Sequence, residues 1–189
     1  MTREQGMLLV AIARNAIASH LGLPHEPLPA TKEKSWLDDL KATFVTLHKQ
    51  GELRGCIGSL QAHRPLIIDV TENALAAAFK DPRFPPVTAE EWPLVDVEVS
   101  VLSAPRPLKV NSEQEALSAL KPGQDGLILE YPPYHRATFL PQVWEQLPDP
   151  HAFLAHLKLK AGLPSDAWSK DFRLYTYEVE KFRQTENES

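Results

Sequence analysis

Residues 95–102 read VDVEVSVL, and this stretch carries the clearest secondary-structure signal in the chain. Valine recurs at every second position, and Asp96, Glu98 and Ser100 fill the positions between. Because neighbouring side chains of a strand point to opposite faces, the alternation gives one apolar and one polar face. We therefore predict a β-strand over 95–102 with its valine face against a hydrophobic core.

The preceding part of the chain predicts a β-hairpin over 41–60. Residues 42–47 (ATFVTL) are rich in β-branched and aromatic side chains, and the turn HKQG at 48–51 offers Gly51 for a positive φ. Residues 52–60 then return as the second strand, with a bulge expected at Gly58.

Capping signals and apolar spacing predict the remaining elements. Thr2 and Gln5 form a capping box for a helix over 4–20, and Pro65 suits the first turn of a helix over 66–79. Thr88 and Glu91 carry a second capping-box signature. We also predict helices at 112–121 and 149–162 and strands at 127–131, 136–140 and 172–182. Since helices and hairpins mix without regular βαβ alternation, the fold class is α+β with mainly antiparallel sheets and packed helices.

Composition excludes several classes of function. The chain has 189 residues, enough for one domain or two small subdomains, and a net charge of −5 gives no basic excess for nucleic-acid binding. No apolar run reaches the roughly 18 residues of a membrane helix. A single cysteine, Cys56, permits no internal disulfide, so we expect a cytoplasmic protein. The segment after Phe182 is expected to be a disordered tail.

No metal or cofactor motif is recognisable. The chain has 7 histidines, but His151 and His156 are five positions apart and would face different sides of a helix. The glycine-containing stretches at 55–58 and 123–126 match neither a phosphate-binding nor a dinucleotide-binding pattern. We therefore predict no bound metal and no cofactor.

The hexapeptide LRGCIG at 53–58 is the first candidate for chemistry. On a strand Arg54 and Cys56 would point to the same face, and a cation beside a thiol favours the thiolate. Gly55 and Gly58 remove side-chain bulk, so another backbone or a ligand could approach closely. The alternative is that Cys56 is a buried small hydrophobic residue, as free cysteines often are.

Two other features could belong to the same site. The segment DPRFPP at 81–86 would hold Arg83 on a rigid loop as an anion clamp, or it would merely anchor Phe84. Glu98 lies on the polar face of the 95–102 strand, where it is either a solvated surface residue or, in a cleft, a partner of Arg54 or Arg83 or a general base.

Taken together, the motifs resemble a known family. In order along the chain they are LRGCIG at 53–58, DPRFPP at 81–86, VSVL at 99–102, GQDGL at 123–127, ATFLPQVW at 137–144 and KLKAGLP at 158–164. This set resembles the AMMECR-type domain family, and most closely its bacterial branch, AmmeMemoRadiSam system protein A. The resemblance covers about residues 5–183.

The resemblance implies a single domain over 5–183 made of two α+β subdomains around a cleft, with residues 184–189 as the tail. The Arg-Gly-Cys segment would flank that cleft, and the family pattern adds Thr138 and Pro141 after the second hairpin. The genes of this family often accompany a Memo-like protein and a radical S-adenosylmethionine enzyme, which suggests that these proteins are partners in a modification pathway.

Two functional hypotheses follow. In the first, Cys56 is a nucleophile or redox-active thiol, Arg54 favours its thiolate, Glu98 moves the proton, and Gly55, Gly58, Arg83 and Thr138 hold an anionic ligand. In the second, the chain is a non-catalytic module that binds a small anion or a protein, and Cys56 is merely packed.

Overall fold

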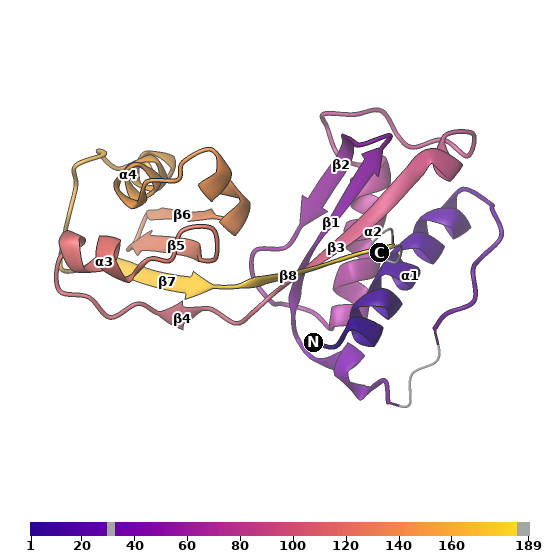
Figure 1. Cartoon of the computed structure of the whole chain (residues 1–189), viewed down its shortest axis with the longest axis horizontal. Coiled ribbons are helices and arrows are strands. Elements are labelled where there is room, and N and C mark those ends of the chain that lie inside the picture. The colour runs from indigo at the N-terminus through magenta and orange to yellow at the C-terminus, as the bar shows by residue number, and fades with distance from the viewer. Residues whose placement is uncertain (30–32, 185–189) are drawn as a thin grey trace. The chain divides into compact units, whose positions relative to one another are not determined.

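The computed structural model describes residues 1–29 and 33–184. The chain divides into two compact units (Figure 1). The first contains the chain up to Leu102 and resumes at Glu180, and the second runs from Ser103 to Val179. Each unit holds one four-stranded antiparallel sheet with helices packed on it, so the predicted α+β class is confirmed.

The first unit is built on a sheet of strand order β2-β1-β3-β8. The central strand β1 pairs antiparallel with β2 on one side and β3 on the other. The helices α1 and α2 pack against each other and cover one face of this sheet (Figure 1). The elements are α1 (Arg3–His20), η1 (Ser35–Asp38), β1 (Ala42–Lys49), β2 (Glu52–Gly58), α2 (Leu66–Phe79), η2 (Trp92–Leu94), β3 (Val95–Leu102) and β8 (Val179–Arg183).

The strand β3 has the bounds that its alternation predicts, and its valines form part of the core under the helices. Val97 and Val99 are fully buried and are the β3 partners of Leu47 and Val45 of β1. Burying each such side chain contributes about 1.5–3 kcal/mol. The polar positions of β3 therefore face the other side of the sheet.

Local signals set the ends of α1 as predicted. The Thr2 hydroxyl accepts from the N–H of Gln5 at 3.1 Å, and the Gln5 side chain accepts from the N–H of Thr2 at 2.9 Å. Gly22 follows the helix with φ of 73°, a conformation that ends helices and favours glycine.

The second unit is built on a sheet of order β4-β7-β5-β6. Its core contains the stacked rings of Trp144 and Phe153, whose centroids lie 3.7 Å apart. The fully buried ammonium of Lys158 in α4 is bonded to Glu113 at the start of α3. The elements are β4 (Arg106–Pro107), α3 (Glu113–Ala119), β5 (Gly126–Tyr131), β6 (His135–Phe139), η3 (Pro141–Glu145), α4 (Pro150–Lys160) and β7 (Arg173–Tyr177).

Two predictions about the strands are wrong. The final strand over 172–182 is two strands, β7 and β8, which belong to different sheets and are separated at Glu178. The bulge is not at Gly58: the register shifts between Leu47, which pairs with Gly55, and His48, which pairs with Leu53, so Arg54 is the extra residue.

Of the predicted tail at 184–189, all but Gln184 lies outside the described residues. No helix among the described residues is long and apolar enough to cross a membrane.

Candidate functional site around Cys56 and Arg83

The two glycines beside Cys56 serve the packing of the first unit. A Cβ on Gly55 would lie 2.2 Å from the backbone oxygen of Ala77, so this glycine lets α2 approach the strand. A Cβ on Gly58 would lie 2.2 Å from the ring of Phe44. Protein atoms therefore fill the space that a Cβ would take at both positions, and the ligand-binding role of Gly55 and Gly58 stays a prediction.

Cys56 is half-buried on the sheet face opposite the helices. Its Sγ lies 3.2 Å from Oγ1 of Thr46, its partner across β1 and β2. Its backbone N–H donates to Oδ2 of Asp81 at 2.9 Å. Among the described residues, no histidine is hydrogen-bonded to the thiol. The contacts of Cys56 in the described part of the chain are thus a hydroxyl at its Sγ and a carboxylate at its backbone N–H.

The hydrogen bonds of Arg54 go to the segment that follows α2. Because Arg54 is the bulge residue, the simple alternation that would place it beside Cys56 is broken. Its Nε donates to Oε1 of Glu91 at 2.7 Å, and its Nη2 donates to the backbone oxygen of Pro85 at 2.8 Å. The side chain is only 10% exposed, so we infer that Arg54 fixes the 81–91 segment to the sheet.

The sequence analysis assigns Glu91 no role in the site, but in the structure Glu91 binds Arg54. Its capping box with Thr88 is confirmed, since each residue's N–H donates to the other's side chain, at 3.0 and 3.3 Å. The same carboxylate accepts from Arg54, and this hydrogen bond lowers the pKa of Glu91 to about 2 despite burial, which acts in the opposite direction. The Thr-x-x-Glu spacing could have identified the cap, but no sequence signal linked it to Arg54.

Arg83 is the cation that the structure places near Cys56. Its Nε and Nη2 donate to Oδ1 and Oδ2 of Asp81 at 3.0 and 2.8 Å, and its Nη2 lies 3.4 Å from the backbone oxygen of Cys56. The hydrogen bond from Arg83 holds the pKa of Asp81 well below its usual range, although burial opposes this effect.

Arg83 and Asp81 each shift the pKa of the other. The hydrogen bond to Asp81 is the main cause that raises the pKa of Arg83, desolvation opposes it, and Coulombic attraction to Asp81 and Cys56 raises this pKa further. The Arg83 side chain is 54% exposed, whereas that of Asp81 is almost fully buried. Its guanidinium also lies 5.4 Å from the ring centroid of Phe84. The guanidinium of Arg83 is therefore held in place, half exposed, next to the backbone of Cys56 in β2.

Of the other predicted site residues, Glu98 lies in the row of Cys56 and Thr138 lies in the second unit. Glu98 is the partner of Thr46 on β3, so Cys56, Thr46 and Glu98 form one row across the polar face. The ion-pair partner of Glu98 is Arg183 of β8, at 3.5 Å, instead of Arg54 or Arg83. Thr138 belongs to the second unit, where its hydroxyl lies 3.0 Å from that of Tyr177. Burial raises the pKa of Tyr177, and the bond to Thr138 partly opposes this.

Within residues 1–29 and 33–184, no group of three or more histidine, cysteine, aspartate or glutamate side chains could hold a metal ion.

Comparison with known proteins identifies the family to which this chain belongs. The sequence model of the AMMECR1 family matches residues 10–182. Protein MJ0810 of Methanocaldococcus jannaschii is 42% identical over 194 residues, covering 98% of this chain and 93% of that protein. A protein of Methanothermobacter thermautotrophicus is also 42% identical, covering 97% and 96%.

The fold agrees with that of a solved relative. The crystal structure of the uncharacterized protein PH0010 from Pyrococcus horikoshii superposes with a TM-score of 0.80 at 36% identity, covering 98% of this chain and 94% of the other. The chain therefore belongs to the AMMECR1 family.

Proposed function

We propose that this chain binds a small anionic ligand at Arg83, next to Cys56, and works in the cytoplasm as an AmmeMemoRadiSam system protein A. In this proposal it acts with a Memo-like protein and a radical S-adenosylmethionine enzyme in a modification pathway. The family membership supports the general class, and the pathway and partners are inferred from the resemblance of the motifs.

One observation carries the ligand site: the guanidinium of Arg83 is half exposed and yet fixed in place by Asp81. Asp81 already takes the Nε and Nη2 edge of the guanidinium, so a ligand would accept from Nη1. A cation that is fixed in place loses less conformational entropy when it binds an anion. Its Nη1 has no hydrogen-bond partner among the described residues. A ligand can therefore bind without displacing Asp81.

The role of Cys56 distinguishes two versions of this function. We favour the binding version, because Arg54 is bonded to Glu91 and no base among the residues that the structure describes is bonded to the thiol. The second candidate is a cysteine-dependent enzyme, favoured by the hydroxyl of Thr46 at 3.2 Å from Sγ and by Glu98 in the next position of the same row. In both versions Arg83 holds the anionic group of the ligand.

Thermal unfolding in the presence of inorganic phosphate, acetate and succinate tests the anion site. We expect at least one of these anions to raise the Tm of the wild type, because a ligand that binds only the folded state stabilises it. Arg83→Gln should abolish this rise, whereas Arg106→Gln, at an exposed arginine of the second unit, should retain it. A rise that persists in Arg83→Gln, or the absence of a rise with all three anions, would overturn the site.

A further inference from the structure

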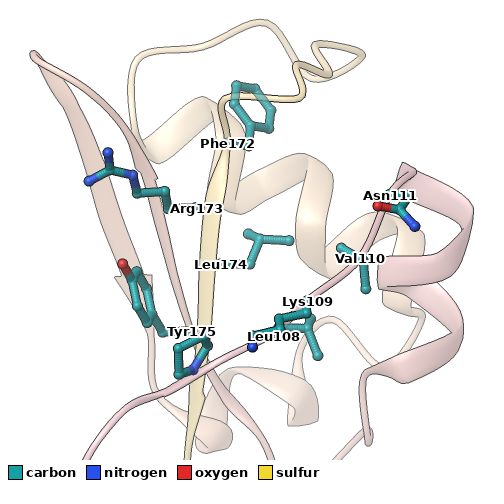
Figure 2. A pocket seen from close by; sticks show the side chains of 9 residues that line it. Leu108, Lys109, Val110, Asn111, Phe172, Arg173, Leu174 and Tyr175 are labelled. Atoms are coloured by element: carbon teal, nitrogen blue, oxygen red, sulfur yellow. The ribbon is translucent and has the colours of Figure 1, made fainter.

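The second unit carries a wedge-shaped groove where the chain after β4 leaves the edge of β7 (Figure 2). Leu108 still pairs with β7, since its N–H donates to the backbone oxygen of Leu174 at 2.8 Å. Beyond Leu108 the chain turns away, and no backbone hydrogen bond joins residues 109–111 to β7. The groove has a volume of about 410 Å³, which is within the usual range of ligand pockets.

Two backbone groups, the C=O of Phe172 just before β7 and the N–H of Leu174 within it, face this groove, and neither has a hydrogen-bond partner among the described residues. Within a strand, the N–H and the C=O of one residue point to the same edge. Because the C=O of Leu174 accepts from Leu108, the N–H of Leu174 also points to the edge of β7 that borders the groove. The backbone groups of Arg173 point to the opposite edge, where Arg173 pairs with Glu130 of β5. Because successive residues alternate between the two edges, the C=O of Phe172 points into the groove. The Phe172 oxygen and the Leu174 N–H are the acceptor and donor that one residue of a parallel strand binds.

The side chains around the groove combine an apolar wall with a free cation. Leu108, Val110, Phe172 and Leu174 line it and pack onto the core of the unit. Lys109 is exposed beside Leu108 at the narrow end, and it forms no ion pair with any described residue (Figure 2). An unpaired ammonium at this end favours an anionic group there.

The narrow end decides what kind of strand fits. Because Leu108 already occupies the backbone oxygen of Leu174, a strand lying parallel to β7 cannot continue past that residue. It must end there, and a chain that ends there carries a carboxylate beside Lys109. We propose that the groove binds the free C-terminal end of an extended peptide from a partner protein.

The register assigns each part of that peptide. Its last residue lies opposite Arg173, donates its N–H to the C=O of Phe172, and presents its carboxylate to the N–H of Leu174 and the ammonium of Lys109. Since side chains alternate along a strand, the penultimate residue faces the side of Phe172 and Leu174. The proposal therefore requires an apolar penultimate residue.

NMR titration of the ¹⁵N-labelled full chain with acetyl-Ser-Leu-Ser tests the proposal. We expect a saturating shift of the Leu174 amide resonance, with a Kd of about 1 mM or below. Amidation of the peptide's C-terminus, or replacement of its Leu by Ser, should weaken binding by about tenfold, because each removes one recognised group.

Variants of the protein complete the test. Lys109→Gln should weaken binding of the free acid by about fivefold and leave the amidated peptide unaffected. Lys170→Gln, which alters a cation of the neighbouring hollow and not of this groove, should change neither value. No saturating shift, equal binding of acid and amide, or an unchanged affinity in Lys109→Gln would each overturn the proposal.

Discussion

The backbone N–H of Cys56 donates a 2.9 Å hydrogen bond to Oδ2 of Asp81, and the same carboxylate receives the guanidinium of Arg83. One buried carboxylate therefore fixes both the backbone of Cys56 and the guanidinium of Arg83. The strand supplies the thiol and the loop supplies the cation. The proline-bounded segment at 81–86 thus fixes the backbone of Cys56, which lies 25 positions before Asp81 in the sequence.

Replacing Asp81 by Asn should lower the free energy of unfolding by about 2 kcal/mol, because the charge-assisted bonds to Arg83 are lost in a buried setting. Urea unfolding at pH 7 measures this. Asp166→Asn, at an exposed aspartate, should change stability by less than about 0.5 kcal/mol. Equal effects of the two variants would show that the bonds of the Asp81 carboxylate do not stabilise the folded protein.

The pH dependence of stability should report the same carboxylate. Arg83 holds the pKa of Asp81 below its usual range, so its contribution is fully present above the unfolded value near 4 and is lost as pH falls through the folded value. Between about pH 5 and pH 2 the wild type should thus lose stability more steeply than Asp81→Asn. Parallel curves for the two proteins would contradict this assignment.

The pair of Arg54 and Glu91 should behave as a coupled unit. Glu91→Gln should cost about 2 kcal/mol in the wild type, but much less when Arg54 is already Met, because the partner is gone. A double-mutant cycle by urea unfolding gives the coupling, which should exceed about 1 kcal/mol. The contact of Lys49 with Glu91, at 3.4 Å and more exposed, is the matched control and should couple by less than about 1 kcal/mol. Coupling of similar size in both pairs would refute the anchoring role of Arg54.

Two glycines should respond to alanine for different reasons. Gly55→Ala places a Cβ against the backbone of α2, which cannot yield as a side chain end could. We expect a loss of about 3 kcal/mol or more. Gly22→Ala has open space around it but a φ of 73°, so it should cost only about 1 kcal/mol. If thermal unfolding ranks Gly22→Ala as the more damaging change, the close approach of α2 does not explain Gly55.

The sequence allowed most elements of the first unit to be predicted, because each has a local cause. The alternation of β3, the capping box at Thr2 and the turn at Gly51 act within a few residues. The separation of β7 from β8 is different: residues 172–182 carry continuous strand propensity, and only pairing with two distant sheets divides them. Such pairing leaves no local signal.

The candidate site was predicted in its parts and not in its connections. The sequence singles out Cys56 and Arg83 separately, but it does not show that Asp81 joins them. The assignment of Arg54 to the thiol rested on strict alternation, which the bulge at that residue breaks. The role of Glu91 depends on a contact with a residue 37 positions away, which spacing along the chain cannot reveal.

The central claim is that Arg83, and not a residue within the hexapeptide, is the cation that serves Cys56. The most direct measurement is the rate of Cys56 alkylation by the anion iodoacetate, divided by its rate with neutral iodoacetamide, at pH 7 in the wild type, Arg83→Gln and Arg106→Gln. Because a fixed cation beside the thiol attracts the anionic reagent and not the neutral one, this ratio should fall about fivefold in Arg83→Gln and keep its wild-type value in Arg106→Gln. Equal ratios for Arg83→Gln and the wild type, with both proteins folded, would contradict the account.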